Sequence, residues 1–221
     1  GILLLSKVDQ IWSVTPADWR WLFHLAATPA ALGLIVLFFL PESRTWLAAR
    51  RQPGEKQKTA PLRELFQPAL LKITLVGIML GSVPLVGAWA ASKWMIPWAD
   101  KIGGVVQTDY KALTQVWWAF GAILGSLTGA QIARLLGRRR SYFLISLGSL
   151  VLTVAMFQFT APLSPSFFPV VFAQGFVATL FFGWLPLYLP ELFPTHVRAT
   201  GSGISYNVGR FATAAGVLAA G

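Results

Sequence analysis

The sequence predicts an all-α membrane protein, a bundle of helices that each cross a bilayer. Only 12% of its 221 residues are charged and 55% are hydrophobic, whereas a soluble globular domain carries about 25% charged residues. Residues 141–190 contain no charged side chain. One crossing needs roughly 20 apolar residues, so this run is long enough for two. The apolar segments lack the period-two alternation of barrel strands, and helices are therefore the predicted elements.

Five charge-free runs are long enough to span a bilayer, and a sixth extends to the C-terminal end. In chain order the runs cover residues 21–41, 73–92, 112–133, about 141–160, about 167–189 and 201–221, the last interrupted by Arg210. Pro162, Pro165 and Pro169 separate the fourth run from the fifth, because proline interrupts helical hydrogen bonding, so these two runs form a hairpin. Residues 1–5 are typical of the tail of an earlier span, and we expect a fragment of a longer membrane protein.

The runs and the polar segment between them predict three parts. We expect residues 1–41 to hold the tail of one transmembrane helix, an outer loop and the following helix. Residues 42–70 are rich in Arg, Lys, Gln and Pro and are predicted to form a cytoplasmic linker between two helical halves. Residues 71–221 are predicted to form a transmembrane bundle of about five helices, the last of them truncated.

The lysines and arginines fall on alternate connections and orient the bundle. One set of connections carries twelve of these residues and the opposite set carries five, including Lys93 where the second run ends. Because cytoplasmic loops hold an excess of Lys and Arg, the side with twelve is predicted to be cytoplasmic. This topology accounts for the net charge of +10, so nucleic acid is not an expected partner.

Three motifs lie on the predicted cytoplasmic side. Residues 41–47 read Pro-Glu-Ser-Arg-Thr-Trp-Leu, residues 137–140 read Gly-Arg-Arg-Arg, and residues 191–201 read Glu-Leu-Phe-Pro-Thr-His-Val-Arg-Ala-Thr-Gly. In this order and on one membrane face they resemble the major facilitator superfamily, in particular its sugar and organic-acid symporter branches. The resemblance covers nearly the whole chain. It implies the C-terminal half of a twelve-helix fold, from the end of helix five into helix eleven.

The chain departs from the family's patterns at several positions. Arg44 and Thr45 stand where the family has Pro and Arg. Ala130, Arg134 and Leu135 stand where the family has Gly, Asp and Arg in the loop between helices eight and nine. The loss of that carboxylate removes one member of the family's gate network, while the basic cluster that follows it is kept.

The cytoplasmic motifs supply charges for a gate that forms in one state only. A carrier that alternates between two states needs contacts that exist in only one of them. A glutamate at a helix end can pair with the basic loop when the cytoplasmic side closes and release it on opening. The alternative is that the arginines only satisfy the positive-inside rule. The candidate gate residues are Glu191, Arg138, Arg139, Arg140, Arg198 and Glu42.

A glycine stripe marks the third run, with Gly121, Gly125 and Gly129 at spacings of four. Residues four apart share a helix face, and glycines let another helix backbone approach closely. The resemblance implies that this face docks on the opposite, N-terminal half of the carrier. The alternative is ordinary packing within the present half.

Arg210 is a charge inside a predicted span, roughly 15 Å along a helix from Gly201 at 1.5 Å per residue. An intramembrane arginine normally faces a cavity or a partner, so Arg210 either binds an anionic substrate or pairs with a residue of the other half. Tyr206 and Asn207 share its helix face. The resemblance makes the second and fifth runs cavity-lining helices, which adds Trp89 and Gln174. The candidate substrate-binding residues are Arg210, Asn207, Tyr206, Gln174 and Trp89.

These features predict a secondary transporter that moves a small polar solute by alternating access, with proton symport of an organic or sugar acid as the first hypothesis. A neutral sugar porter of the same fold is the alternative, and a non-transporting truncated helical membrane fragment is the alternative of another class. The chain has no phosphate-binding loop and no His-Glu-x-x-His sequence, so we expect no enzymatic activity, no cofactor and no metal.

The expected partners are a small-molecule substrate, the lipid bilayer and a missing N-terminal half. The expected location is the plasma membrane, which is the inner membrane in a bacterium.

Overall fold

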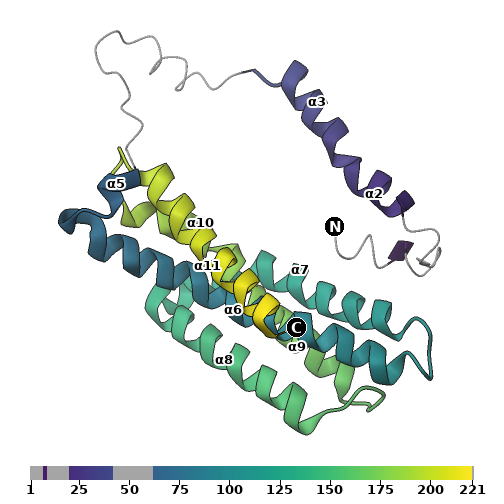
Figure 1. Ribbon diagram of the computed structural model, residues 1–221. Helices are drawn as coiled ribbons and strands as arrows, with labels where there is room; N and C mark the ends of the chain where they lie inside the picture. Colours follow the sequence, from purple (N-terminus) through teal and green to yellow (C-terminus); the bar gives the residue numbers. More distant parts are fainter. Residues whose placement is uncertain (1–6, 9–19, 42–61, 221) are drawn as a thin grey trace. The chain divides into compact units, whose positions relative to one another are not determined.

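The computed structural model describes residues 7–8, 20–41 and 62–220, and the chain divides into two compact units. One unit comprises Ile11–Thr59, and the other comprises Gly1–Gln10 with Ala60–Gly221. Every regular element in the described residues is a helix (Figure 1), which confirms the all-α prediction. Of the predicted linker, residues 42–61 lie outside the described residues.

In the smaller unit, the predicted span at residues 21–41 is helical but interrupted. Helix α2 covers Arg20–Ala27 and α3 covers Pro29–Phe39. Pro29 cannot donate a backbone hydrogen bond to the preceding turn. The hydroxyl of Thr28 donates to the carbonyl of Leu25 at 2.7 Å, so a side chain satisfies one of the acceptors that the proline leaves open.

In the described residues of the larger unit, four helical segments are long and apolar enough to cross a membrane. These segments are Pro68–Gly103, Tyr110–Leu136, Arg138–Phe159 and Phe167–Leu192. The first three are α6, α7 and α8, and the fourth is a series of shorter helices that begins with α9, Phe167–Thr179. The one-turn helix α5, Leu62–Leu65, precedes them and α11, Arg198–Ala220, follows them.

Helix α6 continues well past the end of the predicted run at residue 92. It has 36 residues, which is about 54 Å at 1.5 Å per residue. The charge-free run marks the apolar part of this helix and not its end. Lys93 lies within α6 with ten helical residues after it, so the helix and not a loop carries this residue; its location on the outer side stays a prediction.

Pro84 lies inside α6, and α8 compensates for it. A proline within a helix leaves the carbonyl four residues earlier without its usual donor. That carbonyl belongs to Leu80, and the hydroxyl of Tyr142 on α8 donates to it at 3.2 Å. The interrupted helix thereby becomes a fixed contact between α6 and α8.

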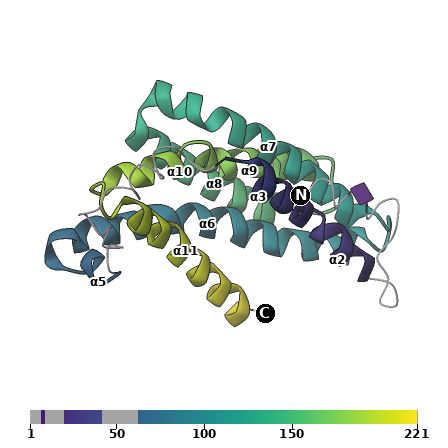
Figure 2. The same ribbon diagram turned by 90° about the horizontal axis from the view of Figure 1, so that it is seen from above.

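Helices α6 and α11 run parallel and pack closely over their first halves. An added Cβ at Gly77 would meet Ser205, and one at Gly209 would lie 2.6 Å from the Cα of Ser82. Beyond this seam α11 leaves α6, as Figure 2 shows for its C-terminal part. Phe211 and Leu218 on this part are 76% and 82% exposed. The two helices therefore diverge toward their C-terminal ends.

The glycine stripe of α7 packs against α9 within this bundle. Cβ atoms added at Gly121, Gly125 and Gly129 would overlap backbone carbonyl oxygens of the segment 172–180. All three glycines are buried. The prediction that this stripe docks on an opposite half is therefore wrong. The alternative of packing within the half is what the structure shows.

The fourth spanning segment is broken where it reaches the predicted cytoplasmic end. After α9 come the 3-10 turn η1 at Leu180–Gly183, α10 at Leu185–Tyr188 and a second 3-10 turn, η2, at Leu189–Leu192. Pro186 and Pro190 lack the N–H groups that a continuous helix would need. The segment consequently advances in single turns, and this break positions the side chains between Phe181 and Glu191.

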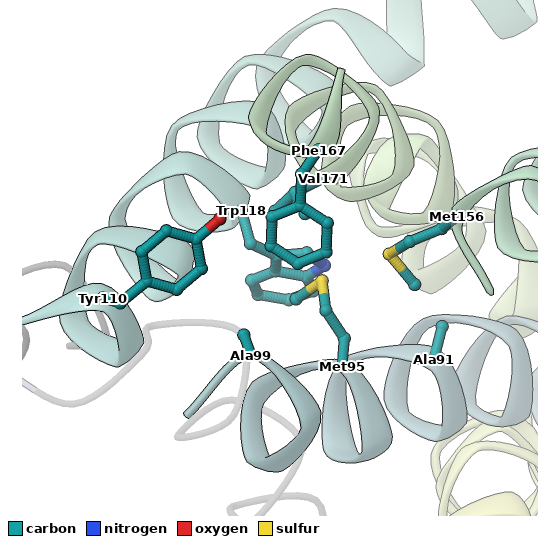
Figure 3. Close-up of a cluster of buried hydrophobic side chains, with 8 residues drawn as sticks. All are labelled: Ala91, Met95, Ala99, Tyr110, Trp118, Met156, Phe167 and Val171. Carbon is teal, nitrogen blue, oxygen red and sulfur yellow. The ribbon is translucent and has the colours of Figure 1, made fainter. Parts of the chain in front are cut away.

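The core between α6, α7, α8 and α9 is aromatic and sulfur-rich. Figure 3 shows Met95, Trp118 and Phe167 gathered from three helices, with Met156 approaching from α8. Phe167, Met95 and Met156 are fully buried. Tyr110 completes this cluster, and its hydroxyl accepts a hydrogen bond from the N–H of Leu163 at 2.7 Å. The hairpin turn after α8 is thereby attached to the start of α7.

Candidate functional site

A cavity of about 700 Å³ lies where α11 diverges from α6. Its volume falls within the roughly 300–1,000 Å³ typical of small-molecule sites. Helix α6, the 3-10 turn η1 and helix α11 all contribute to its wall. The lining residues are Leu85, Trp89, Lys93, Phe182, Tyr206, Arg210, Thr213, Ala214 and Leu218.

Two helical stripes form most of this wall. On α6, Leu85, Trp89 and Lys93 follow one another at spacings of four, so they share one face. On α11, Tyr206 and Arg210 show the same spacing. The cavity thus brings together three of the five predicted substrate residues, Trp89, Tyr206 and Arg210.

The guanidinium of Arg210 is held by its own helix. Its Cζ lies 4.8 Å from the centroid of the Tyr206 ring, within cation–π range. One of its NH groups donates to the side-chain oxygen of Asn207 at 3.5 Å. No described carboxylate forms an ion pair with Arg210. Arg210 is therefore oriented by neutral groups and retains its charge for a ligand.

Lys93 is the charged cavity residue that the sequence reasoning missed. Its Nζ lies 5.8 Å from the centroid of the Trp89 ring, and it lines the same cavity as Arg210. The spacing of four from Trp89 was the available signal, but the end of the charge-free run concealed it. Phe182 was also missed; it lies in η1, the 3-10 turn that interrupts the predicted fifth run.

Gln174 lies away from this cavity. It is fully buried, and its side-chain oxygen accepts a hydrogen bond from the indole N–H of Trp118 at 2.8 Å. The amide nitrogen of Gln174 has no hydrogen-bond partner among the described residues. The prediction that Gln174 contacts substrate is wrong in this structure, because the amide is enclosed between α7 and α9 and stabilises their contact.

Asn207 faces a second, smaller hollow. Its amide nitrogen donates to the carbonyl of Gly203 at 2.8 Å. This hollow of about 390 Å³ is lined on one side by Pro186 and Leu189 and on the other by α11 residues, including Tyr206. Tyr206 therefore separates the two spaces. Asn207 reaches the main cavity only through its bond to Arg210.

At the predicted cytoplasmic end, Arg138 pairs with Glu191. Their side chains form an ion pair between the start of α8 and η2, and the Arg138 guanidinium also lies 4.6 Å from the centroid of the Tyr188 ring. Both partners are about half exposed. The structure thus selects one arginine of the three proposed to meet Glu191.

The other predicted gate residues have different surroundings. Arg139 and Arg140 are exposed and lie beside a shallow hollow next to Tyr188. The Nε of Arg198 donates to the carbonyl of Phe193 at 3.4 Å. Glu42 lies outside the described residues. Within the described residues, no group of three or more His, Cys, Asp or Glu side chains is placed to hold a metal ion.

Comparison with known proteins gives a family and a set of relatives. Residues 2–217 match the family model described as Major Facilitator Superfamily. The chain is 27% identical over 209 residues to the cis,cis-muconate transport protein of Acinetobacter baylyi, an alignment that covers 92% of this chain and 49% of that protein.

Two further relatives show similar coverage. The chain is 27% identical to the probable 4-methylmuconolactone transporter of Cupriavidus pinatubonensis, over 99% of this chain and 50% of that protein. It is 25% identical to the arabinose-proton symporter of Bacillus subtilis, over 85% of this chain and 47% of that protein. The chain thus spans about half the length of these relatives. No solved structure gives a significant match.

Proposed function

The chain belongs to the major facilitator superfamily, and from this we propose that the protein containing it is a secondary transporter for an organic or sugar acid. Its four long apolar helical segments make it an integral, multi-pass membrane protein. We propose that the membrane is a bacterial inner membrane.

The cavity around Arg210 is the observation that supports an acid as substrate. A charged side chain within a membrane helix is costly unless it faces a cavity or a partner. Arg210 lines a cavity of about 700 Å³ and is braced by Tyr206 and Asn207. A planar guanidinium binds a carboxylate through two parallel hydrogen bonds. The site is therefore suited to a small molecule that carries a carboxylate.

The relatives support the same class and also suggest a second candidate. Two of them are named for transport of cis,cis-muconate and 4-methylmuconolactone. Another is named an arabinose-proton symporter, which favours a neutral sugar as the alternative substrate. In that case Trp89 and Tyr206 would supply stacking surfaces in the cavity, and Arg210 would pair with a residue of the other half.

We also propose that this bundle works by rocking against a second bundle, with the Arg138–Glu191 ion pair present only when the cytoplasmic side is closed. The ion pair connects the start of α8 to η2, so separation of these ends would break it. The acidic residues of the described long spans, Asp100 and Glu191, lie at segment ends, and each pairs with a cation. A carboxylate that carries a coupling proton is therefore expected in the second bundle.

A thermal-shift screen tests the substrate class. The longest natural reading frame that contains this chain is purified in detergent and melted with organic acids, acidic sugars and neutral sugars. We expect stabilisation by an acid that disappears in Arg210→Ala and persists in Arg140→Ala, which removes a basic residue outside the cavity. Stabilisation by a neutral sugar in all three proteins would refute the acid and favour the sugar porter. A reading frame without a further set of spans would favour a non-transporting fragment.

A further inference from the structure

We propose that the cavity binds a dianion, an elongated dicarboxylate whose two carboxylates are received by Arg210 and Lys93. This inference rests on the proposed function and deepens it. It adds Lys93 as the residue that selects for the charge of the substrate. The observations that carry it are the depths of the two cations, their lack of acidic partners and the aromatic rings beside them.

The two cations lie at different depths along one cavity. Gly209 packs against Ser82 and Leu85, so Arg210 is level with residues 83–86 of the parallel helix α6. The backbone of Lys93 is some seven to ten residues further along, which is about 10–15 Å at 1.5 Å per residue. Two cations separated along the cavity suit a ligand with a negative charge at each end.

Neither cation is neutralised by the described part of the chain. The lining residues of the cavity include no Asp or Glu. The nearest following acid on α6, Asp100, forms an ion pair with Lys111 at 3.2 Å. A cleft with apolar walls and charges of one sign concentrates ions of the opposite sign. The cavity therefore favours a ligand with two negative charges over a ligand with one.

Each cation lies beside an aromatic ring, and the rings indicate a flat ligand. Lys93 lies over Trp89 and Arg210 lies over Tyr206. A ring that covers one face of a guanidinium leaves its edge free to donate hydrogen bonds in the plane. Trp89 lies at the Lys93 end of the cavity and Tyr206 at the Arg210 end, with Phe182 also in the wall. A planar, conjugated chain between the two carboxylates can stack on these rings.

Equilibrium binding with four probes tests the proposal on the full-length protein in detergent. Two probes are six-carbon dienes: cis,cis-muconate has two carboxylates and sorbate has one. Adipate is the saturated six-carbon dicarboxylate, and arabinose is the neutral sugar. The variants are Lys93→Gln, Lys93→Arg and Arg210→Gln. Lys101→Gln is the matched control, because it removes an exposed lysine from the same helix outside the cavity.

We expect muconate to bind at least roughly tenfold more tightly than sorbate, since one charge-assisted hydrogen bond contributes about that much. Lys93→Gln should remove this preference, because it should weaken muconate by at least roughly tenfold more than it weakens sorbate. A melting temperature without ligand that equals that of the wild-type protein shows that the variant is folded. Lys93→Arg and Lys101→Gln should keep the preference. Adipate should bind more weakly than muconate, because it is flexible and not planar.

Two results would overturn the dianion site while the proposed function survives. One is equal affinity of the wild-type protein for muconate and sorbate, with both lost in Arg210→Gln. The other is a Lys93→Gln variant that keeps its preference for muconate. Binding of arabinose alone, with no acid bound, would overturn both the dianion site and the proposed acid transport.

Discussion

Replacing Gly125 by alanine tests the contact between α7 and α9, on which the arrangement of the bundle depends. A Cβ at this position would overlap the carbonyl oxygen of Phe176 and stand 2.6 Å from the hydroxyl of Thr179. That hydroxyl already donates to carbonyl oxygens of α7 and α9. The obstacle is a backbone and a fixed side chain, so α9 has to move as a unit.

The size of the effect follows from this geometry. Non-bonded heavy atoms pack best at about 3.5–4.0 Å, so α9 must retreat by about 1.5 Å from the added Cβ. Overpacking costs about 1–3 kcal/mol, and a backbone obstacle places the cost at the upper end. Alanine regains about 1 kcal/mol of helix propensity over glycine. The expected net loss in the free energy of unfolding is therefore about 2 kcal/mol, by the same two estimates.

A second glycine supplies the control. At Gly87 in α6, an added Cβ would meet only the hydroxyl of Ser149, at an ordinary 3.5 Å. Gly87→Ala should therefore raise stability by up to about 1 kcal/mol. For a protein about twice as long as this chain the shift is about 1–2 °C per kcal/mol, so the two variants should differ by about 3–6 °C in melting temperature. The assay is thermal melting of the full-length protein in detergent. A Gly125→Ala variant that melts as high as Gly87→Ala would refute the close approach of α9 to α7.

Two further predictions concern the gate and the buried amide. Glu191→Gln should remove the ion pair to Arg138 and shift the protein toward a state that is open to the cytoplasm. The measurement is the labelling rate of a cysteine placed at the cytoplasmic side, which should rise. Arg140→Gln is the control, and an equal labelling rate in both variants would contradict the gate. Gln174→Leu should lower stability by about 1–3 kcal/mol, because the indole N–H of Trp118 loses its buried acceptor, yet leave substrate affinity unchanged. A stable Gln174→Leu protein that no longer binds substrate would show that Gln174 contacts the substrate after all.

The positions of the membrane helices follow from the sequence because transfer of side chains into lipid is a property of each segment by itself. The runs at 112–133, 141–160 and 167–189 coincide with spanning segments in the structure to within a few residues. The helix ends are less well predicted. Lys93 shows why, since a lysine can extend a helix beyond its apolar part and the charge then marks the edge of the run but not of the helix.

Only the tertiary structure shows which helix packs against each helix face. The spacing of Gly121, Gly125 and Gly129 indicates a close backbone contact. A glycine face can pack against any helix of suitable shape, however, and in the structure that helix is α9. The choice of Arg138 among three arginines depends on where η2 ends. Gln174 and Arg210 are both polar residues in apolar helices, and only packing separates them.

The sequence by itself thus determined an all-helical membrane bundle of the major facilitator type and predicted the position of Arg210 within the last apolar run, because hydropathy, charge and short motifs are local. The tertiary structure decided which residues share a cavity. It placed Lys93 with Arg210 and enclosed Gln174 in the core. The physical reason is that a cavity is made by the divergence of α6 and α11 and by the break at η1, and both depend on contacts between residues far apart in the chain.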